Sequence, residues 1–417
     1  MNVLLKSATI VDPKSNFHNQ TLDVLIEKGV ITNISKRINN PKNYKEIALD
    51  NLHISQGWFD SSVSFGEPGY EERETLSNGF HTAALSGYTA VAINPNTNPV
   101  IDSNAAISFL KSKASKHAVD IYPIGALTKD SNGNDLSEMF DMQKAGAVAY
   151  GDYQKPIDNP NVLKLALLYA INFDGLVLSF PQDSQISGQG VMNENFTSTS
   201  IGLKGNPSLA EELQISRDLF LLEYTGGKLH IPIISSAKSV ELIRAAKKKK
   251  LNISCGVAIH NLVFTDDMLT TFDTNFKVSP PLRTNADKDA LIEGLKDGTI
   301  DMVTSDHNPL DIEHKKIEFD FAKYGTIGLE SAFGALNTIF TVKKTIDLLT
   351  KGKSRFGIDT SSIGIGVQAN ISLFNPNQNY QFTENHIHSK SKNSMFANHE
   401  LKGKVYGIIS NNQIVLN

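Results

Sequence analysis

The sequence lacks the features that would tie it to a membrane, a nucleic acid or an oxidising compartment. Among its 417 residues there is one cysteine, Cys255, so no intramolecular disulfide can form and the chain fits a reducing cytoplasm. No apolar run reaches the ~18 residues that a membrane-spanning helix needs. Residues 1–6 also lack the apolar region and cleavage site of a signal peptide. The net charge of -4 gives no reason to expect nucleic acid or an anionic membrane as a partner.

What is present is the composition of a globular protein with a sizeable core. Hydrophobic residues make up 40% of the chain and charged residues 20%. The length suffices for one large barrel or for two to three ordinary domains. Cys255, in the apolar run 253–257, is expected to be a small buried strand residue, because no partner base marks it as a nucleophile.

Both ends of the chain are rich in strand patterns. Apolar segments at 21–26 and 30–34 flank the turn Glu27-Lys28-Gly29, a pattern typical of a β-hairpin. Segments 370–374 and 403–409 near the C-terminus have the same character. We therefore expect residues 1–52 and 346–417 to form one small composite β domain, similar to a β-sandwich.

The centre of the chain alternates short apolar strands with helical patterns. Repeated strand–helix units of this kind predict a parallel sheet, most simply a closed (β/α)8 TIM-type barrel over residues 53–345. The strand patterns lie at 89–93, 147–150, 176–178, 229–234, 253–257 and 302–305, and the helical patterns at 76–86, 162–171, 209–223, 239–249 and 287–296.

Short motifs follow one another in a fixed order along the chain: Asn94-Pro95-Asn96-Thr97-Asn98-Pro99, Gly188 to Glu194, Lys277 to Arg283, Thr304-Ser305-Asp306-His307-Asn308-Pro309 and Gly325 to Glu330. Together they resemble the long bacterial type of dihydroorotase, within the amidohydrolase superfamily. The resemblance covers nearly the whole chain and implies a zinc-dependent barrel enzyme of pyrimidine biosynthesis that opens or closes a cyclic amide. In such enzymes the metal activates water and an aspartate after the eighth strand moves the proton.

The zinc-ligand positions implied by this resemblance do not carry histidine. The family's first barrel strand bears His-x-His, whose side chains point the same way and grip one metal; here the two positions are Ser62 and Ser64. Two further histidine positions fall on Phe180 and Ile233. Zinc is bound by imidazole, thiolate or carboxylate and only poorly by a neutral hydroxyl. We therefore expect no metal and no other cofactor, although active family members use zinc.

Some functional positions of the family survive. Asp306 matches the catalytic aspartate and is a vestigial candidate for that role. The bridging-carboxylate position falls on Asp152 or, one residue later, on Tyr153. Asn96 and Arg283 are the candidate substrate-binding residues, although Arg283 could equally cap its own loop.

Other substrate positions are changed: Gly66, Ser279 and Leu310 replace the family's Arg, Asn and His. The leading hypothesis is a non-catalytic dihydroorotase-like protein. In some bacteria an inactive homologue is the structural partner of aspartate transcarbamoylase, and the resemblance implies that role here. A homo-oligomer is the other assembly expected. Two alternatives remain open: an active dihydroorotase, imidase or hydantoinase with a rebuilt site, and a module that binds a pyrimidine precursor without converting it.

Overall fold

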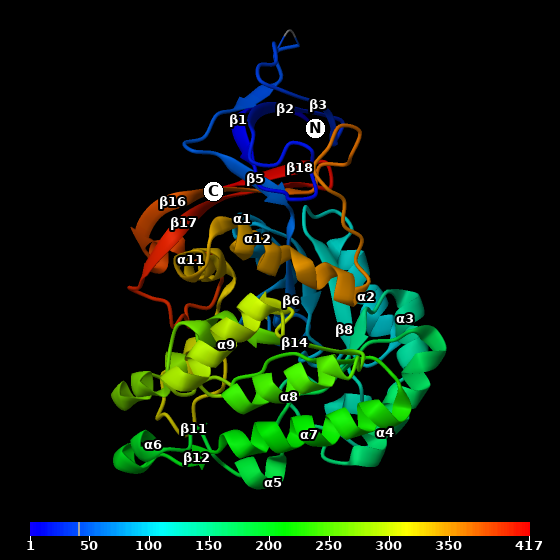
Figure 1. Cartoon of the computed structure of the whole chain (residues 1–417), viewed down its shortest axis with the longest axis vertical. Helices are drawn as coiled ribbons and strands as arrows, with labels where there is room; N and C mark the ends of the chain where they lie inside the picture. The colour runs from blue at the N-terminus through cyan, green and yellow to red at the C-terminus, as the bar shows by residue number, and fades with distance from the viewer. Residues whose placement is uncertain (41) are drawn as a thin grey trace.

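A closed barrel of eight parallel strands occupies the middle of the chain in the computed structural model, which describes residues 1–40 and 42–417 (Figure 1). The first and last strands are joined where Val63 bridges His307 and the Ser64 N–H donates to the His307 carbonyl at 2.7 Å. The predicted (β/α)8 barrel is confirmed. In spatial order its strands are β6 (Trp58–Val63), β7 (Tyr88–Ile93), β8 (Asp120–Gly125), β9 (Ala149–Tyr150), β10 (Val177–Leu178), β13 (Leu229–Ile231), β14 (Ile253–Ala258) and β15 (Met302–Thr304).

Helices cover the outside of the barrel. Several begin at hydroxyl N-caps: Thr75 accepts from the Asn78 N–H, and Thr284 forms a capping box with Asp287. Helix α2 was not predicted from the sequence, because only Ile107 and Leu110 of that helix are buried and its apolar pattern is weak. The helices are α1 (Leu76–Leu85), α2 (Asn104–Ala114), α3 (Met139–Ala145), α4 (Pro160–Ala170), α7 (Ser208–Thr225), α8 (Ala237–Lys248), α9 (Asn285–Asp297), α11 (Leu329–Ile339) and α12 (Val342–Thr350).

The connections at the carboxyl ends of the strands carry small elements of their own. After β10 come α5 (Ser184–Ser187), β11 (Met192–Asn193), α6 (Phe196–Ile201) and β12 (Gly205–Asn206), and after β15 comes α10 (Ile312–Lys315). β11 and β12 pair in parallel as a separate ribbon. Within the described residues, no helix is both long and apolar enough to cross a membrane.

The two ends of the chain build a second, mostly antiparallel sheet beside the barrel (Figure 1). β16 pairs with β5, which joins the C-terminal strands to the N-terminal ones. In spatial order the strands are β18 (Gln413–Leu416), β17 (Glu400–Ser410), β16 (Ile371–Gln381), β5 (His53–Gln56), β1 (Asn2–Ile10), β2 (Thr21–Glu27) and β3 (Val30–Ser35), with β4 (Lys45–Ile47) paired to β1.

The domain limits differ from those expected by a few residues. β5 lies inside the range 53–345 predicted for the barrel, yet it pairs with β1 and β16 of the terminal sheet. The chain therefore enters the barrel at Gly57. At the other limit, α12 continues beyond residue 345 and packs against β6 and β15. Helix–barrel packing, which a local pattern does not reveal, sets this second limit.

Trp58, at the start of β6, anchors the barrel to the terminal sheet. Its ring stacks on Phe333 of α11 with centroids 4.8 Å apart and lies 5.6 Å from Phe374 of β16. Its indole N–H donates to the Ser55 hydroxyl at 2.9 Å. Aromatic packing with a satisfied polar end fixes the orientation of β6, the strand that carries Ser62.

Candidate functional site

Most of the predicted site residues gather at the carboxyl ends of the barrel strands, where enzymes of this fold carry their active sites. Ser62 lies on β6, and its hydroxyl donates to Asp306, which follows β15, at 3.2 Å. Phe180 and Ile233 follow β10 and β13 and line the same small cavity as Ser62 and Asp152. The fold thus brings together all four positions at which the resemblance implies histidine. Ser64 is connected to the other three because the Asn94 amide donates to the hydroxyls of both Ser62 and Ser64.

The space between these residues is almost filled. The cavity they enclose measures about 20 Å³, which is room for roughly one water molecule. Phe180 and Ile233 are only 6% and 2% exposed and point apolar atoms at it. Among the described residues, no group of three or more His, Cys, Asp or Glu side chains could hold a metal ion. Hydroxyl and apolar groups at these positions do not fit a zinc ion.

A hydrogen-bond network occupies the polar side of the cavity. Asp306 Oδ1 accepts from the Tyr153 hydroxyl at 3.0 Å and from Ser62. The Asn94 amide donates to the hydroxyls of Ser62 and Ser64 at 3.1 and 3.2 Å. Burial raises the pKa of Asp306 to about 7, against the opposing effect of the hydrogen bonds from Tyr153 and Ser62. Asp306 is therefore a carboxyl group that can hold its proton near neutrality.

Asp152 and Tyr153, the two alternatives for the bridging position, have different partners. The Asp152 carboxylate accepts from the backbone N–H groups of Leu127 and Thr128 at 2.9 and 3.2 Å, and from the Thr128 hydroxyl. These hydrogen bonds hold the Asp152 carboxylate against the loop after β8. Tyr153 reaches Asp306 instead. The phenol thus lies beside the family's proton-shuttling position, and the carboxylate fixes a loop.

Two residues of this network were missed from the sequence. Asn94 lies in the same Asn-Pro-Asn run as Asn96, and that run could have pointed to it. Asp60 sits two residues before Ser62 on the same face of β6, and it accepts from the Ser62 and Ser305 N–H groups at 3.1 and 2.8 Å. Asp60 ties the two strands that close the barrel. The spacing of two residues between Asp60 and Ser62, which puts both side chains on one face of a strand, could have identified Asp60 from the sequence.

Arg283 is a buried brace in this structure and does not line the mouth of the barrel. Its guanidinium donates to the Asn193 side chain at 2.9 Å, to the Asn206 carbonyl at 2.6 Å and to the Ser235 hydroxyl at 3.1 Å. These bonds tie the β11–β12 ribbon to the loop after β13. Of the two roles considered for Arg283, the contacts correspond to the one that organises loops.

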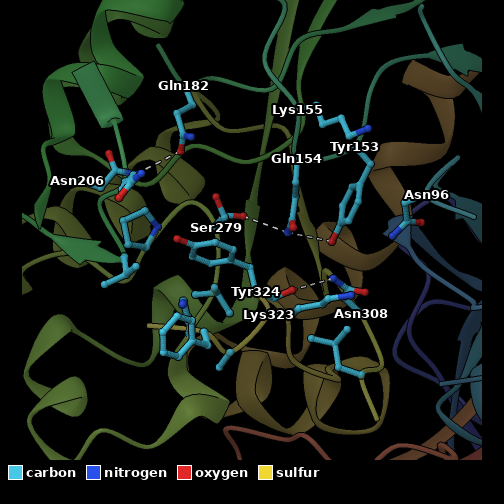
Figure 2. A pocket seen from close by; sticks show the side chains of 18 of the residues that line it. Asn96, Tyr153, Gln154, Lys155, Gln182, Asn206, Ser279, Asn308, Lys323 and Tyr324 are labelled. Atoms are coloured by element: carbon cyan, nitrogen blue, oxygen red, sulfur yellow. Dashed lines mark hydrogen bonds between the residues drawn. The ribbon is translucent and has the colours of Figure 1, made fainter. Parts of the chain in front are cut away.

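Above the small cavity the mouth opens into a cleft of about 1040 Å³. Tyr153 and Gln154 line both spaces and separate them, and Gln154 donates to the Tyr153 hydroxyl at 3.1 Å and to the Ser279 carbonyl at 3.3 Å (Figure 2). Asn96 lines the cleft, and its buried Oδ1 accepts no hydrogen bond within residues 1–40 and 42–417. The cleft is open and polar, whereas the cavity beneath it is closed.

Comparison with known proteins agrees with the motifs. The sequence model of the family described as Dihydro-orotase-like matches residues 53–239. The chain is 38% identical to a dihydroorotase of Acetivibrio thermocellus over 422 residues, covering 99% of each chain. It is also 38% identical to a dihydroorotase of Caldanaerobacter subterraneus subsp. tengcongensis, covering 99% of this chain and 97% of the relative.

The solved structures show the same fold at lower sequence identity. The L-hydantoinase (dihydropyrimidinase) of Arthrobacter aurescens superposes with a TM-score of 0.86 over 100% of this chain and 96% of that chain, at 20% identity. The likeness at this identity concerns architecture, while the two dihydroorotases match the sequence along its whole length. The chain belongs to the dihydroorotase family of the amidohydrolase superfamily.

Proposed function

We propose that this member of the family has lost zinc-dependent hydrolysis and serves in pyrimidine biosynthesis as a structural partner of aspartate transcarbamoylase. The observation that carries the proposal is the filled ligand site: Ser62, Phe180 and Ile233 line a cavity of only about 20 Å³, and Ser64 is hydrogen-bonded to Asn94, which lines the same cavity. Zinc lowers the pKa of its bound water from 15.7 to about 7. A site without imidazole ligands does not activate water in this way. Its rate of hydrolysis is therefore lower by many orders of magnitude.

A partner role is supported by an apolar surface on the outside of the barrel. Helices α4 and α7 pack side by side (Figure 1), and their outer faces expose large apolar side chains over 40% to 78% of their area. Exposed apolar side chains gathered in one place commonly mark a contact surface. We call this the α4–α7 surface; it consists of Leu165, Leu168, Tyr169, Leu213, Phe220 and Tyr224.

Two ion pairs within the chain lie beside this surface. Glu223 of α7 lies 3.0 Å from the Lys249 ammonium, and Asp174, which follows α4, pairs with Lys228. A partner would therefore meet an apolar patch on the helices outside the barrel, away from its mouth. An interface here should bury at least ~1,000 Å² in total.

Metal analysis tests the loss of zinc. Protein purified without chelator is expected to contain far less than one zinc ion per chain by elemental analysis. One or more zinc ions per chain, lost on Asp306→Ala or Asp152→Ala substitution, would contradict the proposal.

Co-expression with aspartate transcarbamoylase tests the partner role. We expect the two proteins to elute together from a size-exclusion column at micromolar concentration, and the double variant Phe220→Ser/Tyr224→Ser to elute separately. Ile365→Ser is the matched control, because Ile365 is 57% exposed but lies in the segment before β16. Separate elution of the unmodified proteins, with an equally stable and active transcarbamoylase, would exclude the scaffold.

The open cleft favours a second candidate function, that of a binding module. A chain that had only to hold a partner would have no need of a 1040 Å³ polar cleft above a closed cavity. Saturable ligand binding without turnover would support this reading, and the charges of the cleft indicate which ligand to use.

A further inference from the structure

The cleft at the barrel mouth has an excess of positive charge. Five of its lining residues are cationic and one, Asp320, is acidic, although the whole chain has a net charge of -4. Asp320 lies close enough to Lys277 to oppose the lowering of that lysine's pKa by burial. The cationic residues are Arg73, Lys155, Lys204, Lys277 and Lys323.

Arg73 is the least satisfied of these cations. Its side chain is 12% exposed, and its guanidinium makes no hydrogen bond to any described residue. Its ionic contact is with Glu72 at 3.5 Å, and that carboxylate is itself 51% exposed. The guanidinium lies over the Tyr70 ring, 3.9 Å from its centroid. The buried Nε–H of Arg73 therefore lacks the hydrogen-bond partner that burial normally demands.

Lys323 places a second positive charge near Arg73. Burial, and next the charge of Arg73, lower the pKa of Lys323. In the described part of the chain the Lys323 ammonium has no ion pair within 4.0 Å, since its neighbours Asp311 and Glu72 act only at longer range. Both cations line the same cleft, and they repel each other unless an anion lies between them.

The other lysines reach only neutral acceptors. Lys155 donates to the Ser131 carbonyl at 3.1 Å, and Lys204 to the Gln189 side chain at 2.9 Å. Each ammonium has three donors, so two remain on each of these side chains. Figure 2 shows Lys155 and Lys323 among the residues around the cleft, together with Tyr324.

We propose that this cleft binds a phosphate-bearing molecule with a planar ring, such as a phosphorylated nucleoside, through Arg73 and Lys323 with help from Lys155 and Lys204. A single carboxylate would neutralise only one of these charges, whereas a di- or triphosphate matches several. Arginine and lysine both suit phosphate oxygens. Phe321, 75% exposed, and Tyr324 line the same cleft and offer faces for a ring.

This site goes beyond the proposed function and does not depend on it. It uses neither Asp306 nor the former metal positions, and it lies on the outer side of Tyr153 and Gln154. Zinc content and transcarbamoylase binding are measured separately, so either proposal can fail without the other.

Titration calorimetry of the full chain tests the proposal with four probes: UTP, inorganic pyrophosphate, uridine and dihydroorotate. UTP and pyrophosphate are expected to bind, with affinity that falls as salt rises, and uridine and dihydroorotate much more weakly. Tighter binding of UTP would identify a nucleotide as the ligand, and equal binding a phosphate group alone. Absence of binding by both phosphate probes at millimolar concentration, or equal binding of dihydroorotate, would overturn the proposal.

Variants locate the site. Arg73→Gln and Lys323→Gln are each expected to weaken pyrophosphate binding about tenfold or more, the usual range for hydrogen bonds to charged groups. Lys323 is exposed, so Lys323→Gln should fold even if Arg73→Gln does not. Lys248→Gln is the matched control, because exposed Lys248 ends α8 at the opposite face of the barrel. Unchanged binding in Lys323→Gln and in a folded Arg73→Gln variant would also overturn the assignment.

Discussion

The closed cavity and the open cleft lie on opposite sides of Tyr153 and Gln154, and they differ in volume and in the side chains that line them. The cavity holds about 20 Å³ between apolar and hydroxyl side chains. The cleft holds about 1040 Å³ between amide, tyrosine and cationic side chains. Where the family resemblance implies zinc ligands, this chain has a nearly filled lower space, while the upper space stays open. The two spaces can differ in this way because the strand-end loops that shape the mouth have their own braces, such as Arg283 and Asp152.

The largest expected effect concerns zinc in the lower space. Ser62→His with Ser64→His should not restore zinc, because Phe180 and Ile233 still fill the cavity. Adding Phe180→His and Ile233→His should raise the zinc content from near zero to about one ion or more per chain, by supplying four imidazoles. Elemental analysis on variants shown to be folded by circular dichroism provides the measurement.

Hydrolysis of dihydroorotate is the functional counterpart. We expect none above background from the unmodified chain or from the double histidine variant, at neutral and alkaline pH. Turnover by the unmodified chain, lost in the Asp306→Ala variant, would contradict this expectation. The lower space would then be a rebuilt active site and not a closed, inactive cavity beneath the open cleft.

Truncating the buried Phe180 side chain, which fills part of the lower space, should destabilise the protein. Phe180→Ala is expected to lower the free energy of unfolding by about 3 to 5 kcal/mol, the usual range for a buried phenylalanine. Denaturant titration gives the value. A loss under about 1 kcal/mol would show that Phe180 does not pack as a core residue, and that the lower space can open.

The pH dependence of stability should report on Asp306. Its pKa is raised from 3.8 to about 7 in the folded protein, so the protonated form stabilises the fold at low pH. This contribution is lost as the pH rises from about 4 to 7. Relative to Asp306→Asn, the unmodified chain should therefore lose about 2 to 3 kcal/mol between pH 5 and 8.

Comparison with Asp306→Asn removes the contribution of Glu74, another buried carboxyl whose pKa burial raises to about 7, because both proteins contain it. Parallel stability curves for the two proteins would show that Asp306 is ionised throughout this range.

The smallest expected effect is that of Lys155→Ala in the open cleft. Lys155 is exposed and its ammonium holds only the Ser131 carbonyl, so the free energy of unfolding should change by no more than about 0.5 kcal/mol. The same denaturant titration used for Phe180→Ala measures it. A loss of several kcal/mol would mean that the cleft, like the cavity, is part of the core.

The sequence by itself determined the barrel, the composite terminal sheet and the family, because strand–helix alternation and ordered motifs are local patterns. It also determined that the four positions at which the family resemblance implies histidine lack imidazole, since side-chain chemistry does not depend on folding. The tertiary structure decided that Asp152 holds a loop while Tyr153 meets Asp306, and that Arg283 braces the β11–β12 ribbon. It alone brought Arg73 and Lys323 together, 250 positions apart in the chain. Contacts between distant loops depend on how the barrel closes, and a local sequence pattern does not predict that closure.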